Sequence, residues 1–168
     1  MIDFKENQKR EEYMWNKYSN TIKNSLTRNN SNASIERISG MLDFDCGIDA
    51  VVKLPNKKSY SIRFISLRIL KNNYNNFTFR IPDSKFKSEL FKLTDTFNPS
   101  PYYHIQITEG NDETQIAILN LYKFSEYVIE NPMFWFNIME YRVKGKRNDY
   151  YSIPIAKFKR FIKIVHIK

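Results

Sequence analysis

The pattern that most constrains this chain is a long amphipathic stretch followed by three strand-like runs. From about Asp3 to Arg28, apolar residues recur at three- and four-residue spacing, which predicts a helix with one apolar face. That face carries Met14, Trp15, Tyr18, Ile22 and Leu26, and Glu11 falls on the same side. The polar stretch Asn29–Asn32 predicts a loop that ends the helix.

Strand patterns follow this loop. The runs Ile35–Asp45, Ile48–Leu54 and Ser59–Leu70 are rich in β-branched and aromatic residues, which predicts three strands. The segment Pro55–Lys58 has the composition of a hairpin turn between the second and the third.

The second half of the chain continues to mix helix and strand patterns. A short strand is predicted over Phe77–Ile81 and a helix over Pro82–Phe97. The remaining predicted elements are two strands, a short helix and the two arms of a hairpin: Tyr102–Thr108, Gln115–Leu121, Tyr122–Glu130, Trp135–Lys144 and Tyr150–Ile155. The expected class is therefore α+β.

Length and composition favour one domain over residues 1–168. With 42% hydrophobic and 15% aromatic residues, 168 residues can form one core and are too few for two ordinary ones. The polar N-terminal segment does not resemble a signal peptide, and no apolar run approaches the roughly 20 residues that span a bilayer. One cysteine, Cys46, and two histidines nearly exclude a Cys/His zinc site. We expect a cytoplasmic protein without a cofactor.

The net charge of +9 is concentrated at one end of the sequence. Residues 142–168 carry nine cations and one acid, whereas residues 1–141 carry 18 cations and 17 acids. A near-neutral body with a basic C-terminal segment predicts that any attraction to a polyanion originates in that segment. A solvated tail that only improves solubility is the alternative.

The order of helix, three antiparallel strands, helix and further strand resembles the core of the PD-(D/E)XK nuclease superfamily, over about residues 3–121. The resemblance implies an α-β-β-β-α-β core, here with an added C-terminal hairpin. In that family, a helix-borne Glu, an Asp opening the second strand and an acid-x-Lys triplet on the third hold one or two Mg²⁺ ions.

The resemblance also implies that this metal site is incomplete. Asp49 takes the place of the second-strand Asp, and Glu11 or Glu12 that of the helix acid. In the third-strand triplet Ser61 replaces the metal-binding acid and Arg63 replaces the lysine. Without that carboxylate Mg²⁺ is held poorly, and an arginine does not lose a proton to tune a water molecule. We therefore expect a vestigial site of Glu11, Asp49, Ser61 and Arg63, without catalysis.

A relocated metal site is the alternative that would preserve nuclease activity. It would use Asp43, Asp45 and Asp49, since some nucleases of this superfamily have migrated sites. The competing interpretation is that Asp43 and Asp45 cap the turn before the second strand and that Asp49 pairs with Arg63. Two isolated histidines, His104 and His166, are expected to be packed or exposed side chains and not catalytic ones.

The C-terminal segment interleaves cations with aromatic and aliphatic residues. Such a pattern can follow a phosphate backbone while aromatic rings stack on bases. In the other interpretation, Phe158, Phe161 and Ile164 simply complete the core. The residues that would bind nucleic acid are Arg142, Lys144, Lys146, Arg147, Lys157, Lys159, Arg160 and Lys163.

In size and character the chain resembles small phage proteins that take over the host cell, a group that includes an inhibitor of the bacterial DNA polymerase sliding clamp. This resemblance implies a non-catalytic protein of the host cytoplasm that binds the clamp, the beta subunit of DNA polymerase III, and blocks its loading on DNA. A homodimer would match the two-fold symmetry of the clamp ring.

Two modes of clamp binding are open. Because the clamp channel is positive, acids would dock there: Asp3, Glu6, Glu11 and Glu12, or Asp43 and Asp45, with Tyr13 as an anchor. Alternatively, Lys87–Phe91 is similar to the clamp-binding pentapeptide and keeps its acid with Leu90 and Phe91, but lacks the leading Gln. Packing of that segment within its own helix is the competing interpretation.

Overall fold

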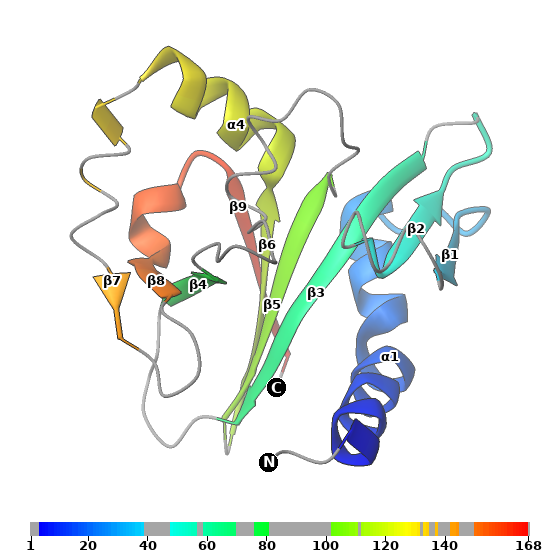
Figure 1. Ribbon diagram of the computed structural model, residues 1–168. Coiled ribbons are helices and arrows are strands. Elements are labelled where there is room, and N and C mark those ends of the chain that lie inside the picture. The colour runs from blue at the N-terminus through cyan, green and yellow to red at the C-terminus, as the bar shows by residue number, and fades with distance from the viewer. Residues whose placement is uncertain are drawn as a thin grey trace.

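The computed structural model describes residues 4–38, 48–56, 59–69, 76–80, 102–110, 112–131, 133–134, 137, 142–144 and 150–167. These residues form helices together with a large mixed sheet and a small antiparallel sheet, which confirms the predicted α+β class (Figure 1). The predicted helix Pro82–Phe97 lies outside the described residues.

The first helix, α1, spans Phe4–Thr27, close to the predicted limits. Its apolar stripe faces the sheet: Met14, Tyr18 and Ile22 are buried and Trp15 and Leu26 are partly buried. After α1, Arg28 and Asn29 adopt left-handed backbone conformations with φ of 54° and 62°, and the Asn29 amide donates to the carbonyl of Asn24. This turn ends the helix within the predicted loop.

The main sheet has six strands in the order β1-β2-β3-β5-β6-β9. The strands β1, β2 and β3 pair in antiparallel fashion, β3 and β5 pair in parallel, and the pairs β5–β6 and β6–β9 are antiparallel. Their bounds are Ser34–Arg37, Ala50–Lys53, Ser59–Ile69, Tyr103–Glu109, Thr114–Asn120 and Ile162–Ile167. In the described residues β1 ends at Arg37, and residues 39–45 of the longer predicted strand fall outside them.

Both faces of the central strands are buried. On one face, Ile105 and Ile107 of β5 pack in the cluster that includes Met14, Tyr18 and Ile22 of α1. Neighbouring residues of a strand point to opposite faces, so His104, Gln106 and Thr108 point away from α1, and these are buried as well. The His104 ring stacks on Phe79 with the ring centroids 5.1 Å apart.

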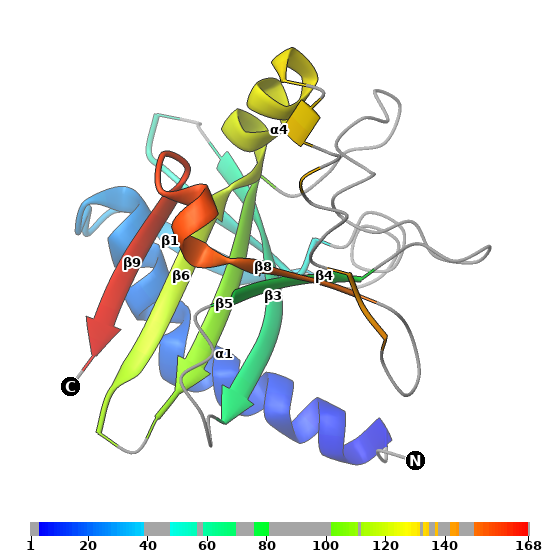
Figure 2. The same cartoon turned by 90° about the vertical axis from the view of Figure 1, so that its left-hand side faces the viewer.

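A second layer covers this other face. It contains a three-stranded sheet in the order β4-β8-β7, with bounds Asn76–Arg80, Tyr150–Pro154 and Arg142–Val143. A short 3-10 helix, η1 (Ile155–Phe158), and α4 (Leu121–Glu130) complete the layer. Figures 1 and 2 show the main sheet between α1 on one side and this layer on the other.

The predictions for the C-terminal half are confirmed in part. The strand predicted over Phe77–Ile81 is confirmed as β4, which belongs to the second sheet and pairs with β8. The hairpin arm beginning at Trp135 is wrong at Asn137, which is helical like Met133 and Phe134. Further along the arm, Arg142 and Val143 pair with β8 as predicted. In the described part of the chain, no helix is long and apolar enough to cross a membrane.

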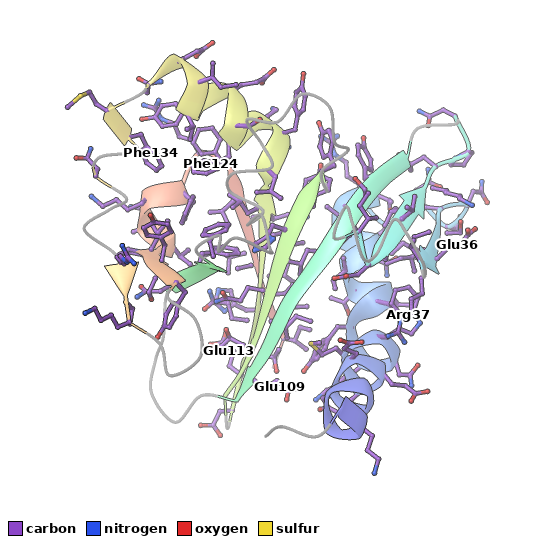
Figure 3. The ribbon with its side chains drawn as sticks, viewed as in Figure 1. Glu36, Arg37, Glu109, Glu113, Phe124 and Phe134 are labelled. Atoms are coloured by element: carbon purple, nitrogen blue, oxygen red, sulfur yellow. The ribbon has the colours of Figure 1, made fainter. Side chains whose placement is uncertain are left out.

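The substitution Phe124→Ala tests the packing of α4. Phe124 is fully buried, and its ring meets the rings of Phe134, Phe158 and Phe161 at 5.1–5.6 Å (Figure 3). Loss of the ring should lower the free energy of unfolding by about 3 to 5 kcal/mol in urea denaturation. Ile129→Ala on the same helix is the control, because Ile129 is 63% exposed and should cost under about 0.5 kcal/mol. Equal effects of the two changes would contradict this packing.

Candidate functional site

The residues expected to form a vestigial metal site lie on different faces of the sheet. Glu11 and Glu12 are exposed on α1, and Glu11 pairs with Arg37 of β1 at 3.3 Å. In β3, Ile62 packs in the α1 cluster, so its neighbour Ser61 points to the opposite face. The structure therefore does not bring the helix acids together with Ser61.

Ser61 helps to join β3 to the start of β5 through hydrogen bonds. Its backbone carbonyl and its hydroxyl oxygen both accept from the backbone N–H of Tyr102, each at 2.9 Å. Asp49 directly precedes Ala50, whose register partner is Ile62, so the Asp49 backbone lies beside that of Arg63. The Asp49 N–H donates to Ile62, and the Asp49 carbonyl accepts from Ile38. The side chain of Arg63 lies outside the described part, so its pairing with Asp49 stays a prediction.

The structure describes only some of the other residues expected at a metal or partner site. Asp3, Asp43, Asp45, Leu90 and Phe91 fall outside the described residues, and Glu6 is placed only as backbone of α1. Within the residues that are described, no group of three His, Cys, Asp or Glu side chains could hold a metal ion. The relocated metal site, which includes Asp43 and Asp45, stays a prediction.

Tyr13, expected as a partner anchor, joins a cluster around Glu109 at the end of β5. Lys17, Tyr13 and Tyr18 of α1 all donate to the same carboxylate oxygen, the first two at 2.8 and 2.9 Å. The Lys17 ammonium also donates to the Tyr13 hydroxyl at 2.6 Å. Figure 3 places Glu109 and Glu113 at the end of the sheet opposite to Phe124, so this cluster fastens α1 at that end.

The cluster shifts the ionisation of its members. Burial acts to raise the pKa of Glu109, but the hydrogen bonds from Lys17, Tyr18 and Tyr13 outweigh burial and hold the pKa below its usual range. The same bond to Glu109, followed by those to Tyr13 and Tyr18, raises the pKa of Lys17. Burial and then the bond to Glu109 raise the pKa of Tyr18. At neutral pH the cluster therefore contains the Glu109 carboxylate, the Lys17 ammonium and the neutral Tyr18 phenol.

The basic C-terminal residues that the structure describes are exposed, and they come from several elements. Lys157, Lys159 and Arg160 project from η1 and the turn after it, around the fully buried Phe158. Lys163 lies on β9 and donates from its ammonium to the carbonyl of Ser25 at 2.6 Å. Exposed Arg142 and Lys144 belong to the second sheet or directly follow it, and Lys146 and Arg147 lie outside the described residues.

Part of the core interpretation for this segment is wrong. Phe158 is fully buried and Phe161 partly buried, as that interpretation requires, but Ile164 is 39% exposed. On β9, Val165 and Ile167 pack against the α1 cluster instead.

A cluster of four tyrosines was missed in the sequence. Tyr60 is the second residue of β3, Tyr102 directly precedes β5, Tyr103 is the first residue of β5, and Tyr122 is in the first turn of α4. The Tyr102 ring lies 4.9 Å from Tyr103 and 5.5 Å from Tyr122, and Tyr60 contacts both rings of the β5 pair. Burial, with the neighbouring Tyr102 and Tyr60, raises the pKa of Tyr103 to about 12, so Tyr103 is neutral at neutral pH. The adjacent tyrosines Tyr102 and Tyr103 at the start of a predicted strand are the sequence feature that could have indicated this cluster.

Backbone hydrogen bonds bring the tyrosines and the basic turn to one end of the sheet. The Leu121 N–H donates to Tyr102 at 3.0 Å, and the neighbouring Asn120 N–H donates to Phe161 at 2.8 Å. Asn120 also caps α4, because its side chain accepts from the Lys123 N–H. The start of α4 thus lies between the tyrosines and the turn that carries Lys159 and Arg160, and Figure 2 shows this turn directly beside α4.

The comparisons with known proteins give no relative for this chain: no family model, curated protein or solved structure matches it.

The substitution Glu109→Gln tests the fastening of α1. Replacing a carboxylate that accepts three hydrogen bonds by a neutral amide should lower the unfolding free energy at pH 7 by about 1 to 3 kcal/mol. A carboxylate with a lowered folded-state pKa stabilises the fold above its unfolded-state pKa and loses this effect as pH falls through the folded-state value. The difference between wild type and variant should therefore shrink in urea titrations below about pH 4.

The control is Glu113→Gln, since Glu113 is half exposed and pairs only with the exposed His166 among the described residues. It should change stability by under about 1 kcal/mol at pH 7. If the unfolding free energy of Glu109→Gln falls at low pH as steeply as that of the wild type, the proposed role of the carboxylate is wrong.

Proposed function

We propose that this protein binds nucleic acid without cleaving it, and that the turn carrying Lys157, Lys159 and Arg160 makes the contact. The observation that carries the proposal is the difference in burial within this segment. Phe158 is fully buried, while the cations on both sides of it are exposed. The segment therefore serves the core and still presents its charge to solvent.

The charge of this surface suits a phosphate backbone. Residues 150–167 contain no acid, so no Asp or Glu of the segment itself neutralises the turn. Cations that neutralise phosphates release condensed counterions, and this release supplies most of the affinity of non-specific binding. Exposed lysines contribute little to stability, so the fold itself does not require positive charge at these positions.

The absence of cleavage is part of the same proposal. A nuclease-like core is supported by the order of α1, three antiparallel strands and a parallel β5. Within such a core, Ser61 supplies no carboxylate, and its hydroxyl oxygen accepts from Tyr102. Glu11 on the other face of the sheet is paired with Arg37. The scaffold is proposed to bind and not to hydrolyse.

Charge reversal at Lys157, Lys159 and Arg160 tests the nucleic-acid contact. The triple change to Glu should weaken binding to a labelled oligonucleotide by on the order of 100-fold at 50 mM salt, and it should flatten the dependence of affinity on salt. Fluorescence anisotropy at several salt concentrations measures both quantities.

The control is the triple change to Glu at Lys9, Arg28 and Lys53. It alters the net charge equally at exposed cations of α1, the turn after it and the end of β2. An equal loss of affinity in the two variants would mean that binding depends on the net charge and not on the position of the cations. Undetectable or salt-independent binding by the wild type would overturn the proposal.

A second candidate function is inhibition of the bacterial sliding clamp, of the phage host-takeover type. The observation that favours it is the outer surface of α1, where Glu11 and Glu12 are exposed and Tyr13 is 43% exposed. This keeps part of the expected acidic docking surface available to a positive channel. Glu11 and Tyr13 would have to dock while bound to Arg37 and Glu109.

Co-elution with purified clamp in size-exclusion chromatography tests this candidate. If α1 docks in the channel, the wild type should co-elute with the clamp at micromolar concentrations, and Glu11→Lys with Glu12→Lys should abolish co-elution. The matched control is Glu126→Lys with Glu130→Lys on α4, which has the same charge change at exposed positions. No co-elution of the wild type would rule the clamp out as a partner, and equal loss in both variants would exclude docking by α1.

A further inference from the structure

We propose that Tyr122, backed by Tyr102, is a stacking platform for a base of single-stranded DNA. This inference rests on the proposed nucleic-acid binding and specifies the form of nucleic acid that the surface accepts. It concerns the end of the sheet where α4 begins, and the basic turn before β9 lies at the same end.

The geometry of the tyrosine pair suits stacking. The rings of Tyr102 and Tyr122 lie 5.5 Å apart and are inclined by only 6°, so they form a nearly parallel stack. Tyr122 is 53% exposed, while Tyr102 is partly buried, so the stack ends at the surface with Tyr122. A nucleobase could extend it by one further ring.

The platform has a rigid support. Behind Tyr102, the ring of Tyr103 stands edge-on at 4.9 Å, and Tyr60 contacts both rings. A ring whose orientation is already fixed loses little conformational entropy when a ligand stacks on it.

Charges around the platform define where phosphates can run. Lys123 is exposed beside Tyr122, and Lys159 and Arg160 lie beyond the helix start. Glu126 and Glu130 are acids further along α4, and both would repel phosphate. The backbone is therefore expected to cross the first turn of α4, from Tyr122 past Lys123 toward the basic turn.

This arrangement favours a single strand over a duplex. Bases within a duplex already stack on each other, whereas a single strand can turn a base out onto an aromatic side chain. The cations act on the phosphates of either form. Stacking by Tyr122 should thus add affinity only for the single strand.

Anisotropy titrations with a 12-nucleotide oligo-dT and with a duplex of equal length test the proposal. Tyr122→Leu should weaken oligo-dT binding about tenfold and leave duplex binding unchanged. Tyr122→Phe retains the ring and should bind oligo-dT like the wild type. Ile129→Ala, a substitution of an exposed apolar residue two turns further along α4, should bind both like the wild type. Melting curves check that each variant is folded.

The outcomes separate this proposal from the function on which it rests. If Tyr122→Leu binds oligo-dT as well as the wild type does, while charge reversal of the basic turn weakens binding, the platform is wrong and the nucleic-acid function stands. Equal loss for oligo-dT and duplex also overturns the platform, because stacking would not affect the duplex. If the wild type binds neither probe, the nucleic-acid function itself fails.

Discussion

The burial of β5 and β6 on both faces is the constraint on which the rest of this structure depends. Ile105 and Ile107 pack toward α1, and His104 and Gln106 are buried beneath the second layer. Burying Gln106 requires a hydrogen bond, and its side-chain amide donates to the carbonyl of Asn76 in β4 at 2.8 Å. Because the core occupies both faces of the sheet, exposed binding groups come from its ends and from the outer sides of the covering elements.

The sequence predicted the elements whose signal is local. The helical spacing of Tyr18 and Ile22 predicted α1, and the β-branched runs predicted every strand of the main sheet except β9. The pairing of β7 with β8 was predicted as a hairpin. The pairing of β4 with β8 could not be predicted, because it is not local: Asn76 of β4 donates to Ser152 of β8, which is 76 residues away. Alternation of polar and apolar residues along β5 is typical of a strand with one face exposed to solvent. In this protein the polar face is buried as well, because His104 packs against Phe79.

The same distinction applies to the candidate site. Composition alone indicated the exposed cations Lys157, Lys159 and Arg160, because charge density is read directly from the sequence. The tyrosine platform was missed, since it combines residues that are distant in sequence, Tyr102 and Tyr122 among them. Tyr13 was expected as a partner anchor, but its hydroxyl donates to Glu109, 96 residues further along the chain. The helix acids and Ser61 take the positions of metal-site residues in the order of elements along the chain. In the fold they lie on opposite faces of the sheet.

We propose that the end of the sheet around the start of α4 binds nucleic acid. Titration of the ¹⁵N-labelled protein with oligo-dT, followed by amide chemical shifts, tests this proposal residue by residue. We expect the largest shifts at Tyr102, Asn120–Lys123 and Lys157–Phe161, which hydrogen bonds join into one surface. Shifts confined to α1 and the Glu109 cluster at the opposite end of the sheet, or no shifts at all, would contradict it.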